Sequence, residues 1–350
     1  MDSSISGQGV SARTNWPPVS IVMPVRGEEQ HLHDATCRLL QQDYPGDIEV
    51  IIAVGPSTDH TAEVAAEVAA TDPRIRVVSN PSGTTPKALN AAIAASHHPI
   101  VARVDGHALL PKDYLRIAVA TLDETGADNV GGVMSAEGVT PFQKAVACAM
   151  TSKLGVGNAR FHTGGKPGPA DTVYLGVFRR SALERVGCYD ESFLRAQDWE
   201  MNYRIRQTGG LVWFQPEMRV SYRPRESIRS LAKQYFYYGR WRRVVARQHR
   251  GTINLRYLAP PVTVTAMAVG LVAVSLGFLP GLAVPGGYLV AILAGSLWTG
   301  RRLPPRALLW LPVVYVTMHC TWGVGFLTSS RRLDVHTGPG GPQIRQRTAN

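Results

Sequence analysis

Acidic residues are absent from a long stretch of this chain. Between Ser227 and Leu333 there is not one Asp or Glu, although the whole sequence carries 26 of them. Soluble domains place charges of both signs on their surfaces, so a stretch of this kind is rare in them. The composition changes near residue 225, and the regions before and after that point predict different structures.

Cysteine is also scarce. The four cysteines are Cys37, Cys148, Cys188 and Cys320. None lies in a CxxC or another close pair, so the sequence indicates neither a zinc site nor a disulfide framework. We interpret the cysteines as small apolar residues.

No apolar leader segment opens the chain. Residues 1–16 are rich in Ser and Gly and have no apolar core. We therefore predict a disordered tail over residues 1–16, no secretory signal peptide, and a main domain that stays in the cytoplasm. A second tail is predicted over residues 329–350.

Three apolar stretches fill the acid-free region. They are Leu258–Leu279, Leu282–Trp298 and Ala307–Leu327. The first would span ~33 Å as a helix, which matches a hydrocarbon core of ~30 Å. The sequence therefore predicts about three transmembrane segments within residues 257–328. The alternative is a set of buried helices in a soluble core, but apolar runs this long without charge are rare there.

Basic residues outnumber acidic ones by 37 to 26, and the net charge of +11 indicates an anionic partner. The excess gathers before the first apolar stretch and, as Arg301, Arg302 and Arg306, between the second and third. The positive-inside rule puts both clusters in the cytoplasm, so the first two stretches form a hairpin. The third would then place the C-terminus outside, which Arg331 and Arg332 argue against. A re-entrant or interfacial third segment is the alternative.

The basic cluster before the first apolar stretch also holds aromatic residues. Tyr235–Arg243 reads YFYYGRWRR. Aromatic and cationic side chains together are typical of a membrane interface, so residues 226–256 are predicted to form a basic, aromatic helix on the bilayer. The same composition fits nucleic acid. A cluster that adjoins a membrane span argues against that partner.

Before residue 225 the sequence alternates between strand and helix signals. The expected strands are 19–25, 48–54, 75–78 and 100–104, and the expected helices are 32–42, 61–70, 86–95 and 112–122. This alternation predicts an α/β domain with a doubly wound, parallel sheet over residues 17–225. Ligands of such sheets bind outside the carboxyl ends of the strands. The residues that follow each strand are therefore the candidates for a site.

Polar turn residues follow three of these strands. Pro24–Glu29 follows the first, Gly55–Thr61 follows the second, and Asp105-Gly106-His107 follows the fourth. Together they predict a nucleotide pocket, although each alone is ordinary turn chemistry. Asp105 and His107 also suit Mn²⁺ or Mg²⁺ bridged to a diphosphate. The alternative for Asp105 is an Asx-turn at a strand end.

In their order, the elements of residues 19–245 resemble those of a family 2 glycosyltransferase with the GT-A fold. Val19–Glu28 resembles that family's first strand and donor-binding turn, and Ser57–Thr61 resembles its Ser-Thr-Asp-Gly-Thr element. Lys87-Ala-Leu-Asn90 resembles its Lys/Arg…Asn helix. The resemblance implies a mostly parallel sheet followed by the C-terminal transmembrane helices.

The remaining motifs extend the resemblance. Asp105-Gly-His stands where the family's Asp-x-Asp metal motif stands, Gln197–Glu200 resembles its Glu-Asp-x-Glu motif, and Arg240-Trp241 resembles its Arg-Trp ending. More narrowly, the Asp-Gly-His variant and the trailing spans resemble bacterial exopolysaccharide glucosyltransferases of the succinoglycan type.

The resemblance implies a role for each matched position. The implied donor-binding residues are Pro24, Arg26, Glu28, Asp59, Lys87, Asn90 and Asp105. Asp105 and His107 would hold Mn²⁺ or Mg²⁺. The residues implied on the acceptor or diphosphate side are Trp199, Glu200, Arg240 and Trp241.

Three positions depart from the family pattern. Val54-Gly55-Pro56 has no carboxylate where the family usually has an Asp that binds the nucleotide base. In addition, Gln197 replaces a Glu. Tyr237 stands at the first position of the Gln/Arg-x-x-Arg-Trp element. The last departure argues against a processive polymer synthase.

Asp198 is the predicted catalytic base. It lies where a helix is expected to begin, and a helix N-terminus favours an ionised carboxylate. The alternative is a simple N-cap. A single displacement assisted by one base gives inversion at the anomeric carbon. The Gly-rich segment Gly155–Ala170 is a candidate lid over the donor, or else a mobile surface loop.

These observations predict an inverting, metal-dependent hexosyltransferase. It would move a sugar from a nucleotide-sugar donor to a lipid-linked, polyprenyl-type acceptor in cell-envelope or exopolysaccharide synthesis. The catalytic domain would lie on the cytoplasmic face of the inner (plasma) membrane, with no nucleic acid as partner. The alternatives are a polyprenyl-phosphate sugar synthase and a non-catalytic membrane scaffold, and Asp105 and Asp198 argue against the scaffold.

Overall fold

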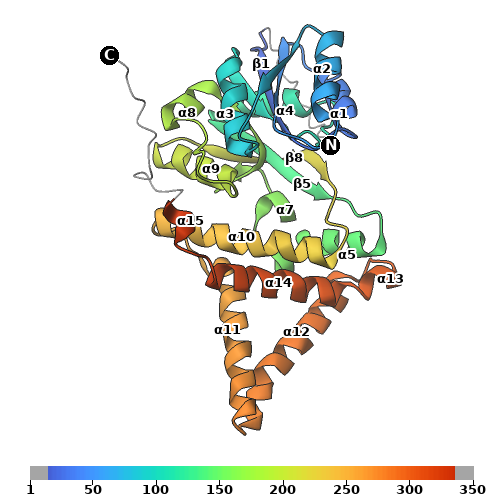
Figure 1. Cartoon of the computed structure of the whole chain (residues 1–350), viewed down its shortest axis with the longest axis vertical. Helices are drawn as coiled ribbons and strands as arrows, with labels where there is room; N and C mark the ends of the chain where they lie inside the picture. The colour runs from blue at the N-terminus through green and yellow to red at the C-terminus, as the bar shows by residue number, and fades with distance from the viewer. Residues whose placement is uncertain (1–14, 336–350) are drawn as a thin grey trace, which may run out of the picture.

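The computed structural model describes residues 15–335 and has two parts (Figure 1). An α/β body comes from residues 15–222, and a base of helices, residues 228–327, lies against one end of it. The tails predicted over 1–16 and 329–350 fall mostly outside the described residues. Within the second tail the structure has a short helix, α15 (Arg332–Val335).

The body is built on one sheet with the strand order β3-β2-β1-β4-β7-β5-β8-β6. The strands are β1 (Val19–Val25), β2 (Ile48–Val54), β3 (Ile75–Ser79), β4 (Ile100–Arg103), β5 (Asn129–Ala136), β6 (Gly168–Pro169), β7 (Tyr174–Arg179) and β8 (Val212–Tyr222). β1 to β4 are parallel, and so are β5 and β8. β7 and β6 run antiparallel to their neighbours. The prediction of a doubly wound, mostly parallel sheet is confirmed.

Helices connect the strands. They are α1 (Leu32–Leu40), α2 (Thr61–Thr71), α3 (Thr85–Ala95), α4 (Tyr114–Thr125), α8 (Arg180–Val186) and α9 (Gln197–Gln207). All of these but α8 lie where the sequence pattern predicts a helix. The first four each follow one of the parallel strands β1 to β4. Both faces of the sheet are therefore covered, which is why the strands are apolar without alternation. Along β1, Ile21 and Met23 are buried in one core and Val22 in another.

The base is organised around two long helices that lie side by side, α10 (Ile228–Gln248) and α14 (Leu311–Leu327). Figure 1 shows both running across the underside of the body, with α5 (Pro141–Met150) beside them. Two other helices, α11 (Leu255–Ser275) and α12 (Ala283–Thr299), project away from the body as a V. The short helix η1 (Leu279–Leu282) joins α11 to α12, and α13 (Pro305–Leu308) lies between α12 and α14.

All three predicted apolar stretches are helices long and apolar enough to cross a membrane. Their surroundings differ. Only 11% of the apolar window of Leu255–Ser275 and 17% of that of Leu279–Thr299 is buried inside the protein, against 33% for Pro305–Leu327. The first two helices therefore present nearly all of their surface outward, whereas the third is partly a packing helix of the protein.

The segment predicted as a lid lies elsewhere. Gly155–Ala170 includes the end of α6 (Lys153–Val156), α7 (Arg160–Thr163) and β6, and none of these described residues lines the pocket presented below. Figure 1 shows α7 between the sheet and α10. A Cβ at Gly155 would collide with the carbonyl oxygen of Ala149. Gly155 therefore serves close packing, while closure of this segment over the donor and a mobile surface loop both stay predictions.

Candidate active site

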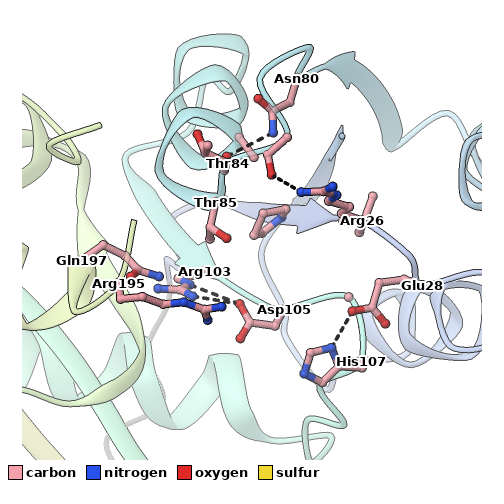
Figure 2. Close-up of a pocket in the computed structure, with 15 residues that line it drawn as sticks. Arg26, Glu28, Asn80, Thr84, Thr85, Arg103, Asp105, His107, Arg195 and Gln197 are labelled. Atoms are coloured by element: carbon pink, nitrogen blue, oxygen red, sulfur yellow. Dashed lines mark hydrogen bonds and ion pairs between the residues drawn. The ribbon is translucent and has the colours of Figure 1, made fainter. Parts of the chain in front are cut away.

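A pocket of about 240 Å³ lies at the carboxyl ends of β1 and β4 (Figure 2). This is the edge of the sheet at which α/β proteins bind ligands. The predicted site residues that line it are Pro24, Arg26, Glu28, Asp105 and His107. They come from two turns that are far apart in the sequence and adjacent in the sheet.

The turn after β1 is fixed by the Ser57–Thr61 element. Ser57 Oγ accepts a hydrogen bond from the Gly27 N–H at 3.1 Å, and Thr61 Oγ1 accepts one from the Glu28 N–H at 2.8 Å. Asp59 accepts a bond of 2.6 Å from the Thr61 hydroxyl, which lowers the pKa of Asp59. Asp59 does not line the pocket. It acts on the turn through Thr61 and by accepting a hydrogen bond of 3.4 Å from the Glu29 N–H.

The turn after β4 approaches the turn after β1 closely. A Cβ at Gly106 would lie 2.9 Å from Cγ1 of Val25 and 3.1 Å from Cγ of Glu28, so a larger residue would push the turns apart. Nδ1 of His107 lies 2.7 Å from Oε1 of Glu28. This hydrogen bond raises the pKa of His107. Glu28 and His107 thus join the two turns at one side of the pocket.

Asp105 and His107 line the same pocket but have different partners. Figure 2 shows Asp105 directed toward Arg103 and His107 directed toward Glu28. Among residues 15–335 no three His, Cys, Asp or Glu side chains gather into a metal site of their own. Because Glu28 holds Nδ1 of His107, Nε2 is the nitrogen left for a cation, and a carboxylate commonly orients a metal-binding imidazole in this way. The residue types therefore fit a divalent cation that takes its remaining ligands from a diphosphate.

Arg103 contacts both carboxylates of the predicted chemistry. Its Nη2 lies 3.0 Å from Oδ1 of Asp105, and its Nη1 pairs with Oδ1 of Asp198. Burial disfavours the charge of Arg103, but Asp105 and Asp198 outweigh that effect and raise its pKa well above the usual value. The side chain is 7% exposed. Arg103 is therefore a fixed positive charge between the two carboxylates.

Asp198 lies in the first turn of α9, as predicted. The N-cap residue of α9, Ala196, has a φ of 60°. This left-handed conformation costs a non-glycine residue about 1–2 kcal/mol and is typical of functional sites. Burial raises the pKa of Asp198, an effect that Arg103 opposes and Asp105 reinforces. A carboxylate with a raised pKa is better matched to the work of a general base at neutral pH.

Like Asp59, two other predicted donor-binding residues lie outside the pocket lining. Lys87 is exposed on α3. Asn90, on the same helix, donates to the Tyr189 carbonyl at 2.8 Å and accepts from the Tyr189 N–H at 2.9 Å. These bonds hold the loop that leads into α9. Asn90 thus supports the segment that carries Asp198.

Two of the residues predicted on the acceptor or diphosphate side follow Asp198 on α9. The Trp199 ring lies 4.1 Å from the guanidinium carbon of Arg242, which belongs to α10. Glu200 is buried and pairs with Arg204 at 2.7 Å. Trp199 therefore connects the helix that carries the candidate catalytic base, Asp198, to α10. Glu200 holds α9 in place through its ion pair with Arg204.

The other two residues of that group belong to α10. Trp241 is buried and packs against Phe193, with ring centroids 6.3 Å apart. The guanidinium carbon of Arg240 lies 5.5 Å from the ring centroid of Phe236. Neither residue lines the pocket, so the structure does not bring them together with the donor-site residues.

Six polar residues of the pocket were not assigned a role from the sequence. They are Asn80, Thr84, Thr85, Arg103, Arg195 and Gln197. Asn80 follows β3 directly and is 5% exposed, so the rule about strand ends would have found it. A charged residue inside an apolar strand was the available signal for Arg103. Arg195 lies in a loop and carries no such signal.

The amino-acid sequence matches the profile of the family described as "Glycosyl transferase family 2" over residues 20–187. It is similar to the "Succinoglycan biosynthesis protein ExoA" of Rhizobium meliloti (strain 1021), with 34% identity over 310 residues that cover 87% of this chain and 93% of that protein. It is also similar to a Methanococcus voltae protein, with 23% identity over 88% of this chain and 95% of that protein. That protein is called "Dolichyl N-acetyl-alpha-D-glucosaminyl phosphate 3-beta-D-2,3-diacetamido-2,3-dideoxy-beta-D-glucuronosyltransferase".

A solved structure is similar over most of its length. It is the mannosyltransferase PcManGT from Pyrobaculum calidifontis in complex with GDP-Man and Mn²⁺, with a TM-score of 0.61 and 20% identity over 90% of this chain and 88% of that one. At this level of identity the likeness shows the fold. Together with the strand order described above, it confirms the GT-A prediction.

Proposed function

The chain belongs to glycosyl transferase family 2, and we propose that it moves a sugar from a nucleotide-sugar donor to a lipid-linked acceptor in exopolysaccharide or cell-envelope synthesis. The protein is a glycosyltransferase. Exopolysaccharide synthesis is supported by the relative named for succinoglycan biosynthesis. The acceptor class is supported by the relative named for a dolichyl-linked glucosaminyl phosphate.

One observation carries this proposal: Arg103 pairs with both Asp105 and Asp198 at the wall of the strand-end pocket. Two carboxylates with separate tasks are thereby held within reach of one donor. Asp105 faces the pocket beside His107, where a diphosphate-bound cation would lie. Asp198, on α9, lies outside the lining of the pocket and is joined to it by Arg103; there an acceptor hydroxyl would lose its proton.

The donor side requires that negative charge on the leaving diphosphate be stabilised. A divalent cation, Mn²⁺ or Mg²⁺, supplies that stabilisation when bound, and the solved relative that contains Mn²⁺ supports the choice of cation. Asp105 and Nε2 of His107 would hold it, with Glu28 fixing the orientation of the imidazole. Arg26 and Arg195 add positive charge to the pocket lining.

The acceptor side requires a base. Asp198 would accept the proton of the attacking hydroxyl, and a single displacement would invert the anomeric carbon. Arg103 would keep Asp198 ionised and fixed in direction before the acceptor arrives. This role makes Arg103 a positioning residue of the reaction.

The helical base would anchor the enzyme to the membrane. α11 and α12 expose apolar side chains along their length, including Val269, Leu271 and Leu293. The many arginines of α10 and the Arg301-Arg302 pair would lie at the lipid headgroups of the cytoplasmic face. The catalytic body would then meet soluble nucleotide sugars on one side and lipid-linked acceptors on the other.

A donor screen tests the proposal. Full-length protein in membrane extracts is incubated with a panel of radiolabelled nucleotide sugars, with Mn²⁺, with Mg²⁺ or with excess chelator, and the products are extracted into organic solvent. We expect one donor to transfer its label to the organic phase, and only when a divalent cation is present.

Other outcomes would point to other functions. If no donor in the panel is consumed, the proposed transfer reaction is contradicted. If the label appears only as free sugar, the lipid-linked acceptor is wrong. Transfer that continues unchanged in chelator would refute the cation roles of Asp105 and His107.

A further inference from the structure

We infer that α14 lies along the membrane surface and does not cross the bilayer, so that the α11–α12 hairpin is the membrane-crossing element and the C-terminal side of α14 faces the cytoplasm. The inference rests on the membrane association proposed above. It differs from the arrangement that hydropathy implies, because all three helices qualify by length and composition. The lipid headgroup region is the surface to which α14 would bind.

α14 and α10 are packed so closely that α14 cannot take an orientation in the membrane different from that of α10. Gly325 faces α10, and a Cβ there would collide with the carbonyl oxygen of Phe236. In the other direction, a Cβ at Gly239 of α10 would collide with the carbonyl oxygen of Trp322 on α14. The two backbones therefore touch through glycines, and Figure 1 shows the helices side by side along their lengths.

Polar contacts hold both ends of α14 to the rest of the protein. Near its C-terminal end, Ser329 Oγ donates to the carbonyl oxygen of Arg240 at 2.9 Å. In its first half, the Tyr315 hydroxyl lies 2.8 Å from Oγ of Ser152, and His319 Nε2 lies 2.9 Å from the Leu154 carbonyl oxygen. Ser152 and Leu154 follow α5 and belong to the α/β body. The whole of α14 is thus fixed to the body and to α10.

The charge of α10 then decides the orientation of the pair. α10 carries six basic residues, namely Arg229, Lys233, Arg240, Arg242, Arg243 and Arg247. If α14 crossed the bilayer, the helix beside it would carry these charges into the hydrocarbon, where each is costly. If both helices lie in the membrane plane, the charges stay at the headgroups, where anionic lipid attracts them.

The residues that flank each helix agree with this arrangement. α14 has arginines before it (Arg301, Arg302 and Arg306) and after it (Arg331 and Arg332). By contrast, no charged residue lies between Arg256 and Arg301, which is the segment that forms the hairpin and its tip. Under the positive-inside rule both ends of α14 stay in the cytoplasm and the hairpin tip can cross.

The outer face of α14 suits the boundary between headgroups and acyl chains. Its exposed positions include Val313, Val324 and Leu327, at 41%, 39% and 43% exposure. They share one side of the helix, because their spacings of eleven and three residues are close to whole turns. The opposite side is packed against α5 and α10. A helix with one apolar face outward and a protein behind it binds in the interface plane.

Reporter fusions to the full chain test the inference. Green fluorescent protein is fused after Asn350 in one version and alkaline phosphatase, active only outside the cytoplasm, in another. A third version carries the phosphatase after Ser275, at the hairpin tip, as the matched control. We expect fluorescence and no phosphatase activity from the two C-terminal fusions, and phosphatase activity from the tip fusion.

Two results would overturn the inference. Phosphatase activity from the C-terminal fusion would mean that α14 crosses the bilayer. An inactive phosphatase after Ser275 would mean that the tip stays in the cytoplasm and that the hairpin does not cross. Labelling of Thr328→Cys with a membrane-impermeant maleimide gives an independent reading in the unfused protein. Labelling above the parent chain is expected only after permeabilisation, and labelling in intact cells would contradict the inference. None of these readouts depends on glycosyl transfer, so a failure of the proposed reaction is seen separately.

Discussion

The α/β body and the helical base neutralise their buried cations in different ways. In the body Arg103 pairs with Asp105 and Asp198, and Arg204 pairs with Glu200. In the base no acidic residue is available from Ser227 to Leu333. Arg243 of α10 instead donates to the carbonyl oxygen of Phe326 on α14 at 3.4 Å.

Arg242 shows the consequence for a single side chain. Its guanidinium carbon lies 4.1 Å from the centroid of the Trp199 ring and 4.0 Å from that of Tyr257. It also donates to the carbonyl oxygen of Thr252. Burial lowers the pKa of Arg242 to about 10, whereas the pKa of Arg103 is raised by its carboxylates. The stability of the body therefore depends on charge pairs and on pH, whereas that of the helical base depends on close packing and on hydrogen bonds to carbonyl oxygens.

The largest expected effect of a single substitution is on catalysis in the α/β body. Asp198→Asn keeps the shape of the side chain and removes the base, so transfer should fall by about 10²–10⁴-fold while donor binding stays within a few-fold. The measurement is single-turnover transfer together with donor affinity. Asp171→Asn is the matched control, because that carboxylate is 64% exposed and is 3.6 Å from Arg206. Near-normal turnover of Asp198→Asn would remove it from the mechanism.

The next effect concerns Arg103. Arg103→Met leaves Asp105 and Asp198 without their buried counter-charge, and the free energy of unfolding should fall by about 3–5 kcal/mol. Burial already raises the pKa of Asp198 and Arg103 opposes that rise, so its loss raises the pKa further. The acid limb of the kcat/KM profile should therefore move to higher pH. Arg103→Lys, which keeps the charge, should restore most of the wild-type profile; a limb that stays in place in Arg103→Met would contradict the role given to Arg103.

In the helical base, a change of packing that alters no charge should lower the stability of the protein. Gly325→Ala would push a Cβ into the Phe236 carbonyl, and overpacking of this kind costs about 1–3 kcal/mol. Gly287→Ala in α12 is the matched control, since a Cβ there meets nothing within 4 Å and alanine favours the helix by about 1 kcal/mol. Thermal unfolding in detergent should rank Gly325→Ala below and Gly287→Ala at or above the wild type. Equal effects would show that the contact between α10 and α14 is not tight.

The smallest expected effect lies at a charge in the body away from the pocket. Burial would raise the pKa of Glu49, but bonds from Ser20, the His97 N–H and Arg76 lower it to about 2. A lowered folded pKa adds stability that is present above the unfolded value of 4.5 and is lost as pH falls toward 2. Glu49→Gln should lose roughly 1 kcal/mol at neutral pH and converge with the wild type in acid. Urea unfolding from pH 7 to pH 3 measures both; a pH-independent difference would contradict the linkage.

Much of the body could be predicted from the sequence because its strands are buried on both faces. Uninterrupted apolar runs such as Val19–Val25, followed by polar turns, mark both the strand and the site at its end. The pocket therefore contains Arg26, Glu28 and Asp105 as predicted. The local sequence does not encode which residues will pair across the fold. The bonds of Arg103 to Asp198 and of Asn90 to Tyr189 join residues about a hundred positions apart, so only the structure reveals them.

The base was less predictable, for a physical reason. Hydropathy measures the affinity of a helix for an apolar environment, and it does not say whether lipid or protein supplies that environment. α12 and α14 have similar composition, yet only α14 has glycines that touch α10.

The central claim is that soluble donor and lipid-linked acceptor meet on the cytoplasmic face, at Asp105 and Asp198. The most direct measurement uses sealed membrane vesicles that contain the full-length protein, supplied from outside with a radiolabelled nucleotide sugar that cannot cross the bilayer. Inside-out vesicles should transfer label to extractable lipid when Mn²⁺ or Mg²⁺ is present, and right-side-out vesicles should not until they are opened. Equal transfer by both kinds of sealed vesicle, or release of the active protein by a carbonate wash, would contradict the account.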